Sequence, residues 1–116
     1  MEENSVNEEN QVEQEKPFVM GNLIELSGFK VLKRDEITIL KKIIGNQLRK
    51  IIDKFGEVER LKFHLKTIHE NDLNHRTYEL HGSLIKGKSY NVEAENKNIF
   101  ICVDVIMKKL YNLVDN

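Results

Sequence analysis

Hydrophobic residues along the chain follow two alternating spacings, one typical of strands and one typical of helices. In residues 23–27 and 58–68 apolar and polar residues alternate, which predicts strands that bury one face. The alternating apolar residues are Ile24 and Leu26 in the first segment and Leu61, Phe63 and Leu65 in the second. Between these segments the apolar residues from Ile39 to Phe55 recur at intervals of three and four. This spacing predicts an amphipathic helix of about five turns.

Several residues indicate where the helices begin and end. Asp35 is the expected N-cap of the first helix, and Gly56 supplies its left-handed stop. Gly45, inside that helix, costs it roughly 1 kcal/mol relative to alanine, unless its missing side chain lets another element approach. Asn98 is the expected cap of a second helix whose apolar stripe continues to Val114.

The remaining apolar pattern predicts a hairpin. Residues 76–85 and 89–96 alternate as strands, and the glycine in the segment IKGKS provides the turn between them. The order is therefore strand, helix, strand, strand, strand, helix. A right-handed crossover makes the first two strands parallel and places both helices on one face of the sheet. The predicted fold class is α+β, a two-layer sandwich with a four-stranded sheet.

The predicted sheet has one apolar face under the helices and one polar, open face. Phe63, Tyr78 and Tyr90 alternate into the covered face, so they are expected in the core and not in base stacking. The open face is predicted to carry three basic residues paired with three glutamates on neighbouring strands: Arg60, Lys62, Lys66, Glu79, Glu93 and Glu95. His64 and His81 are expected there too, with no carboxylate or cysteine at recognisable ligand spacing, so no metal or other cofactor is predicted.

Composition fits one small domain, because the chain has 116 residues, 40% of them hydrophobic and 32% charged. The net charge of −1 hides an asymmetry: residues 1–16 hold six of the nineteen acidic residues and one of the eighteen basic ones. We therefore expect residues 1–17 to be a disordered acidic tail and residues 18–116 to form a mildly basic domain. The tail keeps the protein soluble or, alternatively, acts as an acidic mimic that screens the basic face.

The sequence has no export signal and no apolar run of the roughly 20 residues that span a membrane. A single cysteine, Cys102, excludes an internal disulfide and is consistent with a reducing cytoplasm. It lies among apolar residues with no identifiable base, and no phosphate-binding loop or catalytic pair is recognisable. No enzyme activity, small-molecule substrate or membrane partner is expected.

Basic residues on the predicted helices and at the hairpin tip are the candidates for contact with RNA phosphates. Such contacts give affinity that falls steeply with salt and carries little sequence information. The candidates are Lys41, Lys42, Arg49, Lys50, Lys54, Lys86, Lys88, Lys108 and Lys109. Alternatively, they are the ordinary lysine coating of helices and turns.

The element order and the segment FICVDVIMKKLYNLV resemble the ribosome hibernation-promoting factor and ribosome-associated inhibitor family. Asp104, Lys109 and Leu110 match the spacing of aspartate, lysine and leucine in the last helix of that family. The resemblance covers roughly residues 23–114 and corresponds to a short, single-domain form. Gln47 stands where the family commonly has a lysine, and the family's basic C-terminal tail has no counterpart.

The resemblance implies a protein that occupies the decoding channel of the small ribosomal subunit, contacts ribosomal RNA and silences translation under stress. Two alternatives keep the same architecture. One is a double-stranded RNA-binding module, although that class concentrates lysines where this chain has NIFIC. The other is a protein-interaction or homo-oligomeric domain that buries Ile101 and Val105 against a partner, which we do not favour.

Overall fold

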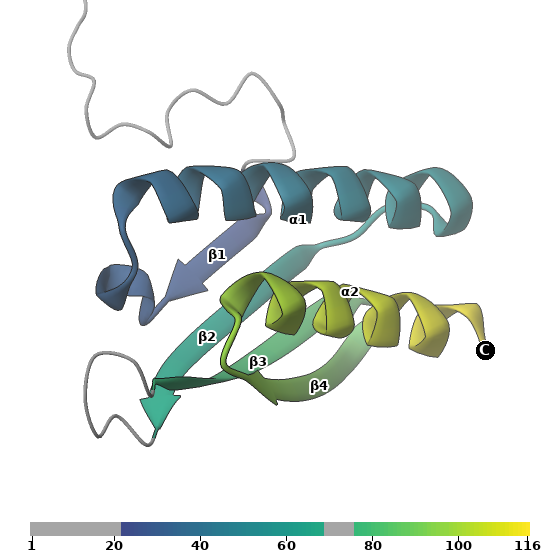
Figure 1. Cartoon of the computed structure of the whole chain (residues 1–116). Helices are drawn as coiled ribbons and strands as arrows, with labels where there is room; N and C mark the ends of the chain where they lie inside the picture. Colours follow the sequence, from purple (N-terminus) through teal and green to yellow (C-terminus); the bar gives the residue numbers. More distant parts are fainter. Residues whose placement is uncertain (1–21, 69–75) are drawn as a thin grey trace, which may run out of the picture.

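Four strands and two helices follow one another in the predicted order (Figure 1). The structure, a computed structural model, describes residues 22–68 and 76–116. The elements are β1 (Ile24–Ser27), a short 3-10 turn η4 (Phe29–Val31), α1 (Arg34–Phe55), β2 (Arg60–Ile68), β3 (Thr77–Lys86), β4 (Lys88–Asn96) and α2 (Ile99–Asp115). The predicted tail 1–17 lies outside the described residues, as do residues 69–75 between β2 and β3.

The sheet has the order β1-β2-β3-β4, with β1 parallel to β2 and the other pairs antiparallel. The parallel pair is the one predicted, because α1 crosses over between its two strands. In the hairpin, Lys86 pairs with Lys88 around Gly87, which has φ 75°. Residues equally far from Gly87 therefore stand opposite each other on β3 and β4.

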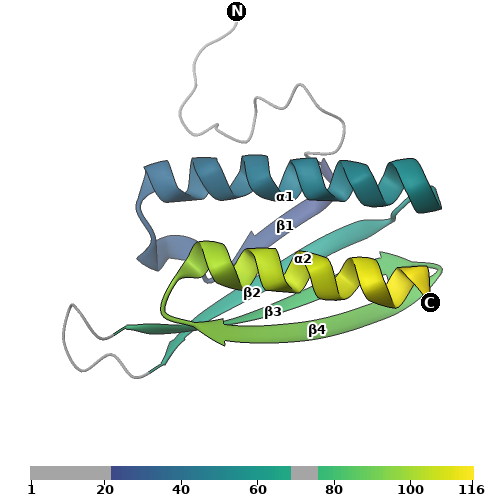
Figure 2. The same ribbon diagram turned by 45° about the vertical axis from the view of Figure 1, so that its right-hand side comes forward.

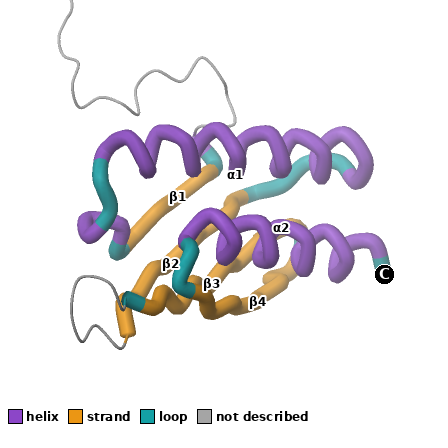
Figure 3. The backbone as a smooth tube through the Cα atoms, viewed as in Figure 1, coloured by secondary structure: helices purple, strands orange, loops and turns teal. Residues whose placement is uncertain are grey.

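Both helices cover the same face of this sheet and lie beside each other above it (Figures 2 and 3). The residues of α1 that are buried recur at helical spacing: Leu40, Ile44, Leu48 and Ile51. The corresponding residues of α2 are Ile99, Cys102, Val103, Ile106, Met107 and Leu110. Phe63 and Tyr78 are buried beneath the helices as predicted, and Tyr90 is partly buried against the same core. The α+β two-layer sandwich is thus confirmed.

Close packing between α2 and the sheet depends on Gly82 in the middle of β3. A Cβ atom built at Gly82 would lie 2.5 Å from Cγ2 of Ile106, well inside van der Waals contact. Ile106 has no exposed surface and packs where a β3 side chain would otherwise stand. The alternating pattern of β3 indicates which face Gly82 belongs to but not that α2 approaches there.

The start of α1 differs from the prediction. The helix begins at Arg34, so Asp35 lies in its first turn and is not the N-cap. The backbone N–H of Lys33 donates instead to the Glu36 carboxylate at 2.8 Å. Both acidic residues remain favourably placed, because the first turn of a helix carries partial positive charge.

The start of α2 and the end of α1 were predicted more accurately. Asn98 caps α2, since its side-chain oxygen accepts from the backbone N–H groups of Phe100 at 2.8 Å and Ile101 at 3.3 Å. Gly56 ends α1 with φ 98°, a value that favours glycine. Its ψ of −172° is extended, however, so the residue is not in the left-handed helical region that we expected.

Replacement of Gly45 by alanine should stabilise the fold. A Cβ atom at Gly45 would meet nothing within 4 Å, so no element uses the space left by the missing side chain. Alanine should therefore raise the free energy of unfolding by about 1 kcal/mol, and the Tm by roughly 4–8 °C. Thermal unfolding followed by circular dichroism measures this change, and an unchanged or lower Tm would contradict it.

The same substitution at Gly82 should have the opposite effect. The added methyl group would force Ile106 or the backbone of β3 to move, at a cost of about 1–3 kcal/mol. The Gly82→Ala variant should melt earlier than the wild type in the same scan. A Tm equal to that of the wild type would mean that α2 does not depend on this contact.

Candidate nucleic-acid interface

The outer face of α1 carries the predicted cations that are most available to a partner. The buried residues of α1 form one stripe along the helix, so the side chains on the opposite side of the helix face away from the sheet. Lys42, Arg49 and Lys50 are exposed and have no hydrogen-bond or ion-pair partner within residues 22–68 and 76–116. Lys41, on the flank of the buried stripe, is only partly exposed.

Lys54 follows Lys50 by one turn of α1 and joins the ends of the two helices. Its Nζ lies 3.7 Å from the Asp115 carboxylate and 5.3 Å from the ring centroids of both Phe55 and Tyr111. The two rings meet edge to face, with centroids 5.2 Å apart. The Tyr111 side chain, and then the charge of Asp115, raise the pKa of Lys54 above its ordinary value. Its charge is thus already shared with neighbours in the fold.

The two adjacent lysines of α2 diverge. Lys108 pairs with Asp104 one turn earlier at 3.1 Å, an ion pair that residues four apart on a helix surface commonly form. Lys109, about 100° further around the helix, turns toward the sheet and donates to the backbone oxygen of Glu93 on β4 at 2.7 Å. Both lysines are candidates for phosphate contact in the sequence, whereas the structure turns them in different directions.

Lys86 and Lys88 flank the β3–β4 turn, which lies at the same end of the sheet as the C-terminus of α2 (Figure 2). The Nζ of Lys86 donates to the backbone oxygen of Glu57, just after α1, at 3.0 Å. That of Lys88 lies 5.2 Å from the ring centroid of Tyr90. Each lysine therefore has a partner within the fold.

The nine candidates thus fall into three groups. Lys42, Arg49 and Lys50 lie on the outer face of α1, with Lys41 on its flank. Lys54, Lys86 and Lys88 lie at the end of the molecule where α1 ends and β3 turns into β4, and α2 holds Lys108 and Lys109. The two helices form one layer above the sheet (Figure 3). The exposed residues Lys42, Arg49, Lys50 and Lys108 lie outside the buried stripes of their helices, so they belong to the side of the molecule that faces away from the sheet. Only part of the predicted set forms one surface.

The open face of the sheet differs from the predicted pattern of ion pairs. Arg60 pairs with Glu25 of β1 at 3.1 Å and not with a glutamate of β3 or β4. Glu79 and Glu93 instead contact His81, at 2.8 and 3.3 Å. Carboxylates therefore do lie at ligand spacing from this histidine, contrary to our expectation. Alternation along β3 and the register around Gly87 are the sequence signals that could have located them.

Cys102 has the apolar environment that the sequence predicts. It is fully buried on α2, and its Sγ lies 3.9 Å from the backbone oxygens of Tyr78 and Asn96. Burial raises the pKa of the thiol, which disfavours the nucleophilic thiolate at neutral pH.

Within residues 22–68 and 76–116, no helix is long and apolar enough to cross a membrane.

Neither a protein-family model nor a curated protein matches the sequence. Among solved structures, the fold is similar to that of a ribosomal subunit interface protein from Coxiella burnetii, with a TM-score of 0.57 and 19% sequence identity. The match covers 79% of this chain and 92% of that chain. At this identity the likeness shows that the two chains share a fold.

The thiol of Cys102 should react with a thiol reagent such as DTNB only when the fold opens. Both complete burial and the raised pKa lower the amount of accessible thiolate. In the native protein the rate of modification should be at least an order of magnitude below that in denaturant. The reaction is followed by absorbance; equal rates in the two conditions would show that Cys102 is accessible.

Proposed function

We propose that this protein binds the small ribosomal subunit and inhibits translation by occupying the channel used by messenger and transfer RNA. The observation that carries the proposal is the shared fold with the ribosomal subunit interface protein, which extends over nearly all of that chain. The sequence resemblance to the hibernation-promoting factor family points in the same direction. A role under stress, in the cytoplasm, is part of this proposal.

The layer of two helices is the side that we assign to ribosomal RNA. Lys42, Arg49 and Lys50 are exposed along α1 without partners among the described residues, so a phosphate would not have to displace an existing ion pair. Each phosphate neutralised in this way releases counterions, which favours binding at low salt. The contacts are to the RNA backbone, so they position the protein without reading sequence.

The cations that already have partners in the fold contribute less to the proposed binding of RNA. Lys54 and Lys108 would have to share their charge between RNA and the nearby Asp115 and Asp104. Their contribution to affinity is therefore smaller than that of the free cations on α1. The protein acts by occupying space that RNA needs, and no bond is made or broken.

Co-sedimentation with purified small ribosomal subunits tests the proposal. The wild-type chain should pellet with the subunits at low salt and be released at moderate salt. Replacement of Lys42 and Lys50 by glutamine should weaken binding and lower the slope of log affinity against log salt by about 2, if each lysine contacts one phosphate.

A matched control replaces Lys62 and Lys66 by glutamine. These residues are also exposed but lie on β2, on the open face of the sheet. The control removes the same charge and should bind almost as well as the wild type, provided that both variants melt like it. If the two variants weaken binding equally, the effect is one of net charge and the helix layer is not the RNA face.

Failure of the wild type to pellet would overturn the proposal. Binding to duplex RNA in a parallel assay would then favour a double-stranded RNA-binding module. Concentration-dependent self-association would instead favour an interaction domain built on the exposed apolar residues of α2, such as Ile101, which is 46% exposed.

A further inference from the structure

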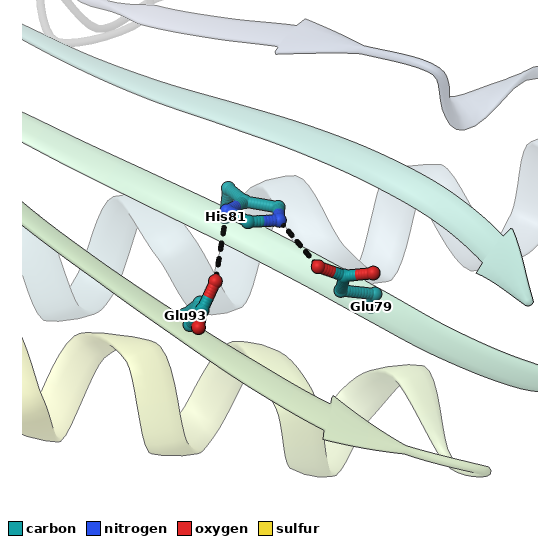
Figure 4. A group of neighbouring side chains, drawn as sticks. All are labelled: Glu79, His81 and Glu93. Atoms are coloured by element: carbon teal, nitrogen blue, oxygen red, sulfur yellow. Dashed lines mark hydrogen bonds and ion pairs between the residues drawn. The ribbon is translucent and has the colours of Figure 1, made fainter.

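Three side chains with metal-binding groups meet on the open face of the sheet, away from the helix layer. Nε2 of His81 lies 2.8 Å from Glu79, and Nδ1 lies 3.3 Å from Glu93 (Figure 4). One ligand atom from each of the three residues can be chosen such that all lie within 4.8 Å of one another. No other residue of the described chain completes such a group.

The strands fix this arrangement. Glu79 and His81 are two residues apart on β3, so both project from its open face, and the register around Gly87 puts Glu93 opposite His81. On this face, Glu79 has Glu95 of β4 on one side and Lys66 of β2 on the other. Rigid strands thus supply the backbone positions, and only the side chains need to move.

Charge is unevenly matched in this cluster. His81 contacts a carboxylate through each of its ring nitrogens. Glu79, Glu93 and the nearby Glu95 bring three negative charges to this part of the face, against the ammonium groups of Lys66, opposite Glu79, and Lys62, which lines a hollow of this face together with His81. A divalent cation would compensate the excess negative charge.

We propose that Glu79, His81 and Glu93 form a binding site for one divalent transition-metal ion, in particular Zn²⁺. Imidazole nitrogen and carboxylate oxygen are both ligands of this ion, at about 2.0–2.2 Å, which places two ligand atoms about 3.4 Å apart in tetrahedral geometry. Nε2 of His81 and the Glu79 carboxylate, 2.8 Å apart, reach this separation with a small rotation of either side chain. The site is open to solvent, because each of its three side chains is at least 30% exposed, and His81 lines a hollow in the open face.

The two glutamates have different roles in this site. A single imidazole cannot present both nitrogens to one ion, so the ion binds the lone pair of Nε2 together with Glu79, and any proton on Nε2 is released to water. The side chain of Glu79 is 30% exposed and that of Glu93 is 67% exposed, so Glu79 is the more firmly held of the two. Glu93 keeps its contact with Nδ1–H and fixes the ring orientation, as carboxylates commonly do for zinc-bound histidines. Water completes the coordination.

His64 provides a matched control within the same face. It stands directly opposite His81 on β2 and lines the same hollow, but its Nδ1 lies 2.8 Å from the hydroxyl of Ser27 and not from a carboxylate. If any histidine on this face sufficed for metal binding, the two residues would be equivalent. In the proposed site the two histidines differ, because only His81 contacts carboxylates.

Isothermal titration of the full chain with ZnCl2 at neutral pH tests the site. All variants carry His69→Asn and His75→Asn, so that His64 and His81 are the only histidines left. In this background one Zn²⁺ should bind per chain and raise the Tm. His81→Asn and Glu79→Gln should each weaken binding at least tenfold, and Glu93→Gln by a smaller factor, whereas His64→Asn should leave it unchanged.

Long-range proton–nitrogen NMR spectra of the histidine rings provide a second readout. Zn²⁺ should shift the Nε2 resonance of His81 most strongly and leave Nδ1 protonated. The site is disproved if no Zn²⁺ binds, or if the His64 and His81 variants lose it equally. It is also disproved if Nδ1 proves to be the coordinated nitrogen. None of these results depends on ribosome binding, so the two proposals fail independently.

Discussion

Burial of one face of the four-stranded sheet beneath α1 and α2 is the constraint on which both candidate surfaces depend. Because side chains alternate along a strand, the covered face takes nearly all the apolar residues of β2 and β3 and leaves the other face polar. The helices in turn bury one stripe each, which fixes which of their lysines can reach a partner. Contact with RNA and with a metal ion is therefore proposed on opposite sides of one core.

Much of this organisation can be predicted from the sequence because it follows from periodicity. The apolar stripes identify both helices, the alternation identifies the faces of β2 to β4, and Asn98 marks the start of α2. Helix ends are harder to predict. The N-cap residue of α1 is Lys33, whose backbone N–H donates to the Glu36 carboxylate. The residue spacing gives no reason to prefer Lys33 over Asp35 as the cap.

Side-chain partners are the part that the sequence does not determine. A lysine has several rotatable bonds and can reach different acceptors, so neighbours such as Lys108 and Lys109 can turn to opposite sides of α2. The contact between Gly82 and Ile106 likewise depends on how α2 sits on the sheet. The cluster around His81, by contrast, follows from alternation and from a hairpin centred on Gly87, and was within reach of sequence reasoning.

The hydrogen bond from Lys109 to the backbone of Glu93 has a consequence for the solubility of the protein. β4 is an outer strand of the sheet, and such strands offer unpaired backbone groups to which another chain can add. Lys109 occupies one of these carbonyl oxygens and holds a charged side chain against the edge. It therefore opposes edge-to-edge pairing with another chain, so a lysine that resembles a nucleic-acid contact in the sequence also protects the edge of the sheet.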